Sequence, residues 1–158
     1  MSYHIPRYEE LPDLKLFVDQ IVTYIDTKLD PFFVDEKIIT SSMINNYVKQ
    51  GIVDPPVKKK YGRTHMVYFI VVCLLKKSFS LDEIDTIIKR VISDMDIPTA
   101  YNYFCDELEV CLEAVKEKKP IAHTPYYSGK DELVYICQSI VLALTYKIYA
   151  QEALKEIE

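Results

Sequence analysis

Glycine and tryptophan are scarce in this chain. It has three glycines and no tryptophan in 158 residues. Because two-residue hairpin turns usually depend on glycine, a sheet-rich fold is disfavoured. With 49% apolar and 27% charged residues, the composition is that of a globular protein. We therefore expect a mainly helical chain that forms one ordinary domain, or a small domain with an attached oligomerisation segment.

The spacings that mark metal sites and catalytic triads are also missing. The four cysteines include no CxxC pair, and the three histidines are isolated along the sequence. We predict reduced core cysteines, no metal, no cofactor and no enzymatic activity. A set of acids falls on helix positions that we expect to face solvent: Asp94, Asp96, Asp106, Glu107 and Glu109.

No stretch has the pattern of a signal peptide or a membrane anchor. The first residues carry charges and prolines where a signal peptide needs an apolar segment. The most apolar run, Leu133 to Ala150, is short for a membrane span and contains Gln138, Thr145 and Lys147. We expect a cytoplasmic protein with a buried final helix and no membrane contact.

Charge is distributed unevenly, although the net charge is −5. From Ile38 to Arg90 there are nine Lys or Arg residues against four acids, whereas the remainder has ten against twenty. A basic segment between acidic flanks is typical of a DNA-binding module attached to a second kind of module.

Capping residues and apolar periodicity predict six helices. Thr40 suits the N-cap of a short helix that Gly51 would end, and Ser80 to Glu83 reads as a capping box. The expected starts and ends, in chain order, are Pro12 to Pro31, Thr40 to Gly51, Thr64 to about Ser78, Ser80 to about Val91, Thr99 to Lys119, and Ser128 to near the C-terminus.

Two neighbouring segments favour nucleic-acid binding. The short helix has a polar face, and the following loop has three consecutive lysines. Lysine and arginine neutralise phosphates, while asparagine pairs with adenine in the major groove. The alternatives are an ordinary exposed helix face and a solvated basic loop. The candidate DNA-binding residues are Ser41, Ser42, Asn45, Asn46, Lys49, Lys58, Lys59, Lys60, Tyr61 and Arg63.

A family resemblance strengthens this interpretation. Tyr47, Gly51, Ile52, Pro55, Tyr61, Arg63 and the sequence "FSLDEI" from Phe79 to Ile84 occupy positions that resemble the MerR-type winged-helix pattern. With the preceding "LPDLKLFVDQIVTYID", the chain resembles an uncharacterised bacterial MerR-like family known as a domain of unknown function. The resemblance implies a mainly α winged helix-turn-helix fold with a small β-hairpin wing. Its parts would be an N-terminal helix (1–35), the DNA-binding domain (36–93) and a helical dimerisation or effector segment (94–158).

Two roles are open for the C-terminal part. Tyr101, His123, Tyr126 and Tyr127 either bind a small-molecule effector, as the resemblance implies, or pack between helices. The stripe from Leu133 to Ile148 either lies inside one subunit or forms a dimer interface, and the resemblance favours a homodimer.

The sequence therefore predicts a dimeric regulator of transcription that binds double-stranded DNA. The alternative is a winged-helix protein-interaction module that does not bind DNA. Asn45, which stands where the family pattern has arginine, and the acidic flanks favour that alternative.

Overall fold

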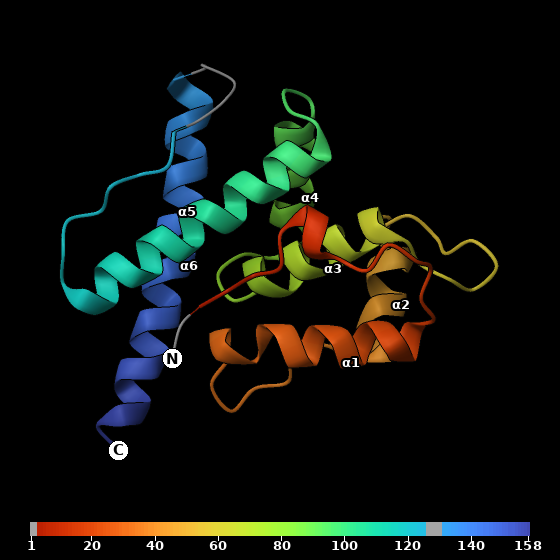
Figure 1. Ribbon diagram of the computed structural model, residues 1–158, viewed down its shortest axis with the longest axis horizontal. Helices are drawn as coiled ribbons and strands as arrows, with labels where there is room; N and C mark the ends of the chain where they lie inside the picture. Colours follow the sequence, from red (N-terminus) through yellow and green to blue (C-terminus); the bar gives the residue numbers. More distant parts are fainter. Residues whose placement is uncertain (1–2, 126–130) are drawn as a thin grey trace.

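The fold is built from six α-helices and two short 3-10 helices in the part of the chain that the structure describes. The structure is a computed structural model, and it describes residues 3–125 and 131–158. α1, α2 and α3 occupy one side of the molecule, and the long helices α5 and α6 cross on the other (Figure 1). The elements are η1 (Tyr8–Glu10), α1 (Val18–Leu29), η2 (Asp30–Phe32), α2 (Ser41–Lys49), α3 (Arg63–Leu75), α4 (Leu81–Ile92), α5 (Ile97–Glu117) and α6 (Asp131–Glu156).

The predicted β-hairpin wing is wrong, because the described residues contain helices and no strand. Two isolated bridges are present instead, Val57 with Lys60 and Leu16 with Tyr61. Pro55 and Pro56 precede the first bridge, and proline has no N–H to extend a ladder. On the other side, α3 begins two residues after Tyr61. The fold class is therefore helical, without a wing.

The first helix begins later than the periodicity predicted. Residues 13–17 are not helical, because the backbone of Leu16 pairs with that of Tyr61. The Leu16 N–H donates to the Tyr61 carbonyl at 2.9 Å, and the Tyr61 N–H donates to the Leu16 carbonyl at 2.8 Å. This long-range pairing replaces the expected first turn, and it leaves Leu14 and Phe17 exposed.

Most of the predicted helix signals lie where expected. The Thr40 hydroxyl accepts from the Met43 N–H at 3.1 Å, and Gly51 has a φ of 78°, which suits glycine after α2. Ser80 and Glu83 form the predicted capping box. Thr64 as the cap of α3 was wrong: Gly62 is the N-cap, and its N–H donates to Nδ1 of His65 at 3.0 Å. The predicted cap of the last helix falls at Ser128, outside the described residues.

One apolar core joins the helices, and α3 lies at its centre. Phe69, Ile70 and Leu74 of α3 are completely buried, which explains why this helix is apolar nearly all round. The core continues through α5 to α6, whose Leu144 is also completely buried. The prediction that the cysteines are reduced core residues is confirmed, since all four are free and buried: Cys73, Cys105, Cys111 and Cys137.

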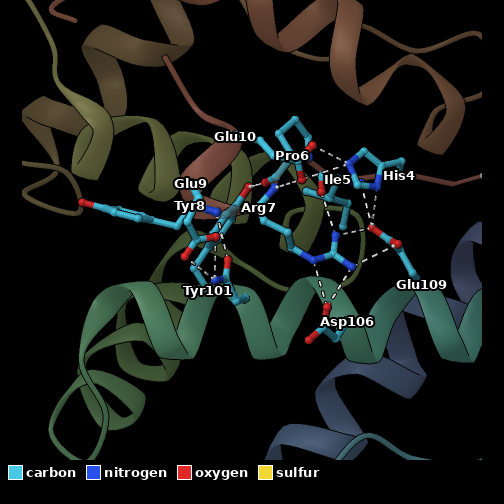
Figure 2. Close-up of polar contacts among 11 residues, drawn as sticks. His4, Ile5, Pro6, Arg7, Tyr8, Glu9, Glu10, Tyr101, Asp106 and Glu109 are labelled. Atoms are coloured by element: carbon cyan, nitrogen blue, oxygen red, sulfur yellow. Dashed lines mark hydrogen bonds and ion pairs between the residues drawn. The ribbon is translucent and has the colours of Figure 1, made fainter. Parts of the chain in front are cut away.

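The N-terminal segment is held against α5 by Arg7 (Figure 2). Nε of Arg7 donates to Asp106 Oδ1 at 2.9 Å, and the guanidinium also pairs with both carboxylate oxygens of Glu109. The same Glu109 accepts from the Ile5 N–H at 2.8 Å, and the Tyr101 hydroxyl donates to the Pro6 carbonyl at 2.6 Å. These bonds fix residues 5–7, which contribute the buried Ile5 to the core.

Replacing Arg7 by Ala is expected to lower the free energy of unfolding by about 2 kcal/mol. The change leaves the half-buried Asp106 and Glu109 without their cation, and hydrogen bonds to charged groups are worth about 1.5–3 kcal/mol. Urea denaturation measures the effect. As a control, Lys89→Ala breaks the exposed pair with Asp85 and should change stability by less than about 0.5 kcal/mol. Equal effects of the two variants would contradict the assigned role of Arg7.

α6 is only partly covered by the rest of the chain. Its segment Glu132–Glu156 is long and apolar enough to cross a membrane by length and composition, and 33% of its most apolar window is buried. Leu133, Val141 and Leu144 face the core, whereas Ile136, Tyr146 and Leu154 are exposed. The prediction of a buried final helix therefore holds for one face of α6 only.

Candidate nucleic-acid interface

α2 turns a polar face toward solvent. Ile44 and Tyr47 are buried and hold the helix on the core, and the Tyr47 hydroxyl accepts from Nζ of Lys76 at 3.1 Å. Burial raises the pKa of Tyr47, so the phenol stays neutral. All five residues predicted on this face are exposed: Ser41, Ser42, Asn45, Asn46 and Lys49.

The lysines that follow form a tight turn, which we call the lysine turn (Val57 to Lys60). The Val57 N–H donates to the Lys60 carbonyl at 2.9 Å, and the Lys60 N–H returns a bond of 3.0 Å. Lys58 and Lys59 are the two central residues, with φ of 51° and 66°. Positive φ at both central positions is the type I′ pattern, which normally selects asparagine and glycine. The lysine turn lies in the loop between α2 and α3 that extends beyond the helices (Figure 1).

Tyr61 anchors the lysine turn to the body of the protein. Its ring packs edge-on against His65 and Phe69, with centroids 5.1 Å and 5.2 Å away. Only 4% of Tyr61 is exposed, and its backbone pairs with Leu16. The structure thus places the predicted DNA contact Tyr61 in the core, where it supports the turn.

Arg63 is largely occupied within the chain. Its guanidinium donates to the Leu11 carbonyl at 3.2 Å, lies 3.7 Å from Asp13 and stacks over the Tyr8 ring at 5.2 Å. Lys60 similarly lies over the exposed Phe17 ring, with Nζ 4.9 Å from its centroid. Arg63 and Lys60 therefore shape the surface, and less of their charge is free for a ligand.

The other cations of the basic segment are divided between paired and unpaired ones. Lys77 pairs with Glu36 at 2.6 Å, Lys89 with Asp85 at 2.8 Å and Arg90 with Asp94 at 2.9 Å. Three lysines of the candidate DNA-binding set are exposed and pair with no acid among the described residues: Lys49, Lys58 and Lys59.

A hollow beside the lysine turn exposes the N-terminus of α3. It has a volume of about 480 Å³, and its lining residues include Lys15, Arg63 and His65 together with one acid, Asp13. The first turn of α3 contains no acid, so the positive end of its dipole is not compensated there. Cations at this end of a helix form an environment that attracts phosphate.

The two predicted effector residues that the structure describes, Tyr101 and His123, have different partners within the chain. Tyr101 is buried and bonded to Pro6, whereas His123 contacts Glu107. Tyr126 and Tyr127 lie outside the described residues. Tyr101 also lines an apolar cavity of about 90 Å³ between α3, α4, α5 and α6, which is below the roughly 300 Å³ typical of ligand pockets.

Residues 6–104 match a family model described as Domain of unknown function (DUF1836). The protein belongs to the DUF1836 family. The match covers well over half of the chain and runs from Pro6 into the first turns of α5. No curated protein and no solved structure matches the chain.

Membership of the DUF1836 family corrects the expected relationship. The resemblance to MerR-type winged-helix proteins is wrong, because DUF1836 is the family that matches and the structure has no wing among its described residues. The motif around Tyr47 and Gly51 misled because a helix, a glycine stop and a proline are general features of helix ends. The family description names no activity, so only the sequence and structure of this protein indicate its function.

One cluster beyond the DUF1836 match was missed. Glu107 was expected to face solvent, and this was wrong: it is 0% exposed and lies beside Cys111 and His123. Burial and the nearby Glu107 raise the pKa of the Cys111 thiol to about 12. The spacing of Glu107 and Cys111, four residues apart on one helix, was the available signal, whereas the approach of His123 depends on the fold.

Proposed function

We propose that this protein binds double-stranded DNA through α2 and the lysine turn, as a regulator of transcription. The observation that carries the proposal is the lysine turn itself. It holds three exposed or half-exposed lysines at the end of a loop, next to a helix with an exposed polar face. Lysines without acidic partners can exchange their counterions for phosphates, which is the main source of affinity for DNA.

The conformation of the lysine turn supports a role beyond linking two helices. A non-glycine residue in the left-handed region costs about 1 kcal/mol, and Lys58 and Lys59 both adopt it. Asparagine and glycine would form the same turn at lower cost. Lysine at these positions adds positive charge but lowers the stability of the fold, and residues that favour activity over stability are typical of functional sites.

Within this proposal the two elements have different tasks. Asn45 and Asn46 have side chains that pair bidentately with adenine, so α2 would read bases in the major groove. Lys49, Lys58 and Lys59 would contact phosphates and set the position of α2 on the duplex. The hollow at the N-terminus of α3 adds a further place for a phosphate.

A second copy of the chain is the partner that we propose for α6. Six exposed residues of α6 recur at steps of three and four residues, as they do in a helix–helix interface. Two of them, Ala143 and Ala150, are small and permit close approach, while Tyr146 and Leu154 offer apolar area. The exposed Lys147 lies among them and favours a protein partner over lipid. Two copies would present two lysine turns to adjacent half-sites. These six residues, which we call the seam, are Ile136, Ser139, Ala143, Tyr146, Ala150 and Leu154.

A protein-interaction module is the second candidate. Leu14, Phe17 and Val57 are exposed apolar side chains on the two segments that carry Lys15 and the lysine turn. Apolar groups beside lysines suit an acidic, amphipathic protein partner. DNA binding that falls steeply with salt distinguishes the first candidate from this one.

Substitutions in α2 test the proposed function. Asn45→Ala should reduce the free energy of binding to a selected duplex by about 1–3 kcal/mol, because a base contact is lost. It should also reduce the preference for the selected duplex over a random one. Lys49→Ala should weaken binding to selected and random duplexes equally. It should also lower the slope of log affinity against log salt concentration by about one in magnitude. Fluorescence anisotropy measures both effects.

The control for these substitutions is Lys119→Ala, in the segment after α5 on the opposite side of the molecule (Figure 1). It should change neither affinity nor preference. If the unmodified protein does not bind duplex DNA at low salt, or if Lys49→Ala and Lys119→Ala behave alike, the proposed role of α2 is wrong.

A further inference from the structure

Glu107 is a carboxylate enclosed in the core with unusual neighbours. Its Oε1 accepts a hydrogen bond from Nδ1 of His123 at 2.5 Å and lies 3.5 Å from Sγ of Cys111. Its Oε2 accepts from the Thr124 N–H at 3.0 Å. Among the described residues no lysine or arginine pairs with Glu107. A buried carboxylate therefore faces a thiol and an imidazole instead of a permanent cation.

This group of side chains carries three different metal-ligand atoms. An oxygen of Glu107, the sulfur of Cys111 and a ring nitrogen of His123 lie within 4.8 Å of one another. Zinc binds carboxylate oxygen, thiolate sulfur and imidazole nitrogen, and a buried anion is stabilised by direct coordination. A cluster composed only of acids would not favour a transition metal in this way.

We propose that Glu107, Cys111 and His123 bind a divalent transition-metal ion of the zinc type. Tetrahedral coordination with bonds of about 2.0 Å to nitrogen or oxygen and 2.3 Å to sulfur separates the ligand atoms by about 3.3–3.6 Å. The sulfur–oxygen distance of 3.5 Å already fits. Nitrogen and oxygen, now 2.5 Å apart, must separate by about 1 Å as the metal takes the place of their shared hydrogen.

The surroundings permit this adjustment. Glu107 and Cys111 are four residues apart on α5, so their side chains share one face of a rigid helix. His123 lies in the segment after α5 and is 31% exposed, so its ring can move without disturbing the core. On binding, the thiol proton leaves to solvent. The shared hydrogen leaves with it if the His123 ring is protonated and moves to Nε2 if the ring is neutral, so the coordinating imidazole is neutral in both cases and no oxidant or reductant is needed.

Three protein ligands leave the fourth coordination position for water or a small exogenous ligand. The ion would tie the segment after α5 to the helix that packs on α6, so metal would stabilise the proposed dimerisation region. The site lies beyond residue 104, where the family match ends, and is independent of DNA binding.

Cobalt(II) titration tests the proposal with the full chain. The unmodified protein should bind one equivalent of Co²⁺ with a cobalt–thiolate charge-transfer band and the visible bands of a tetrahedral ion. Zn²⁺ should displace it. Cys111→Ser and His123→Ala should each raise the dissociation constant more than about 100-fold, since loss of even an outer partner of a metal site costs 10–100-fold.

A cysteine outside the cluster supplies the matched control. Cys73→Ser changes an equally buried thiol in α3 and should leave both the band and the affinity unchanged. If Cys111→Ser fails to fold, as judged by circular dichroism, Glu107→Gln retains the volume and should also lose binding. No cobalt–thiolate band in the unmodified protein, or a band that Cys111→Ser or Glu107→Gln retains, would overturn the proposal.

Discussion

Replacing Lys58 by Asn and Lys59 by Gly is expected to stabilise the protein and at the same time weaken its binding to duplex DNA. Both lysines adopt positive φ in the lysine turn, which Asn-Gly forms with the least strain. Relief of about 1 kcal/mol per residue should raise the free energy of unfolding by about 1–2 kcal/mol. A variant that is more stable but binds less cannot owe its weaker binding to misfolding.

The loss of affinity should be large at low salt. At about 1 kcal/mol for each phosphate contact, the double variant should bind about 30-fold more weakly. Urea denaturation measures the stability and fluorescence anisotropy the affinity.

Lys118 provides a matched control for this variant, because it is another lysine at positive φ, at 59° after α5. The variant with Lys118→Gly and Lys119→Gln also removes two charges and relieves strain, but far from the proposed interface. It should gain stability and keep its affinity for DNA. Equal losses of affinity in the two double variants would show that the net charge, and not the lysine turn, controls binding.

Introducing glutamate at Ala143 and Tyr146 is expected to convert the proposed dimer to a monomer. Both positions are exposed within one chain and lie on the seam that we assign to the second copy. Burying unpaired carboxylates in an interface costs several kcal/mol, so the dimer dissociation constant should rise more than about 100-fold. Sedimentation velocity measures the change in mass.

Dimer loss should also weaken DNA binding. A dimer binds two half-sites of one duplex at the same time, whereas a monomer binds only one. The affinity for the duplex should therefore fall by about 10²–10⁴-fold. Thr86→Glu, which adds a charge to the exposed face of α4, is the control and should leave a dimer. An unmodified protein that sediments as a monomer at micromolar concentration, or a glutamate variant that remains dimeric, would contradict the assignment of α6.

Features that depend on neighbouring residues could be predicted from the sequence. The Thr40 cap, the Ser80 capping box and the left-handed Gly51 follow from contacts within a few residues. The polar face of α2 was likewise predictable, because burial of Ile44 and Tyr47 fixes which side faces solvent.

Features that depend on distant residues could not be predicted in this way. The late start of α1 results from pairing between Leu16 and Tyr61, which are far apart in sequence. Tyr61 enters the core for the same reason, although it stands beside three lysines. Glu107 was assigned to solvent because helical periodicity does not show that a residue after the helix, His123, lies against it. The wing was expected from basic composition and resemblance. The two prolines before Val57 cannot extend a ladder, so Val57 and Lys60 form an isolated bridge instead of a strand pair.

The salt dependence of duplex binding tests the central claim most directly. We predict that the logarithm of the affinity falls linearly with the logarithm of the salt concentration, and that the magnitude of the slope is smaller by about two for the Lys58→Asn, Lys59→Gly variant. A slope identical to that of the unmodified protein, or no binding of duplex DNA at low salt, would contradict the account.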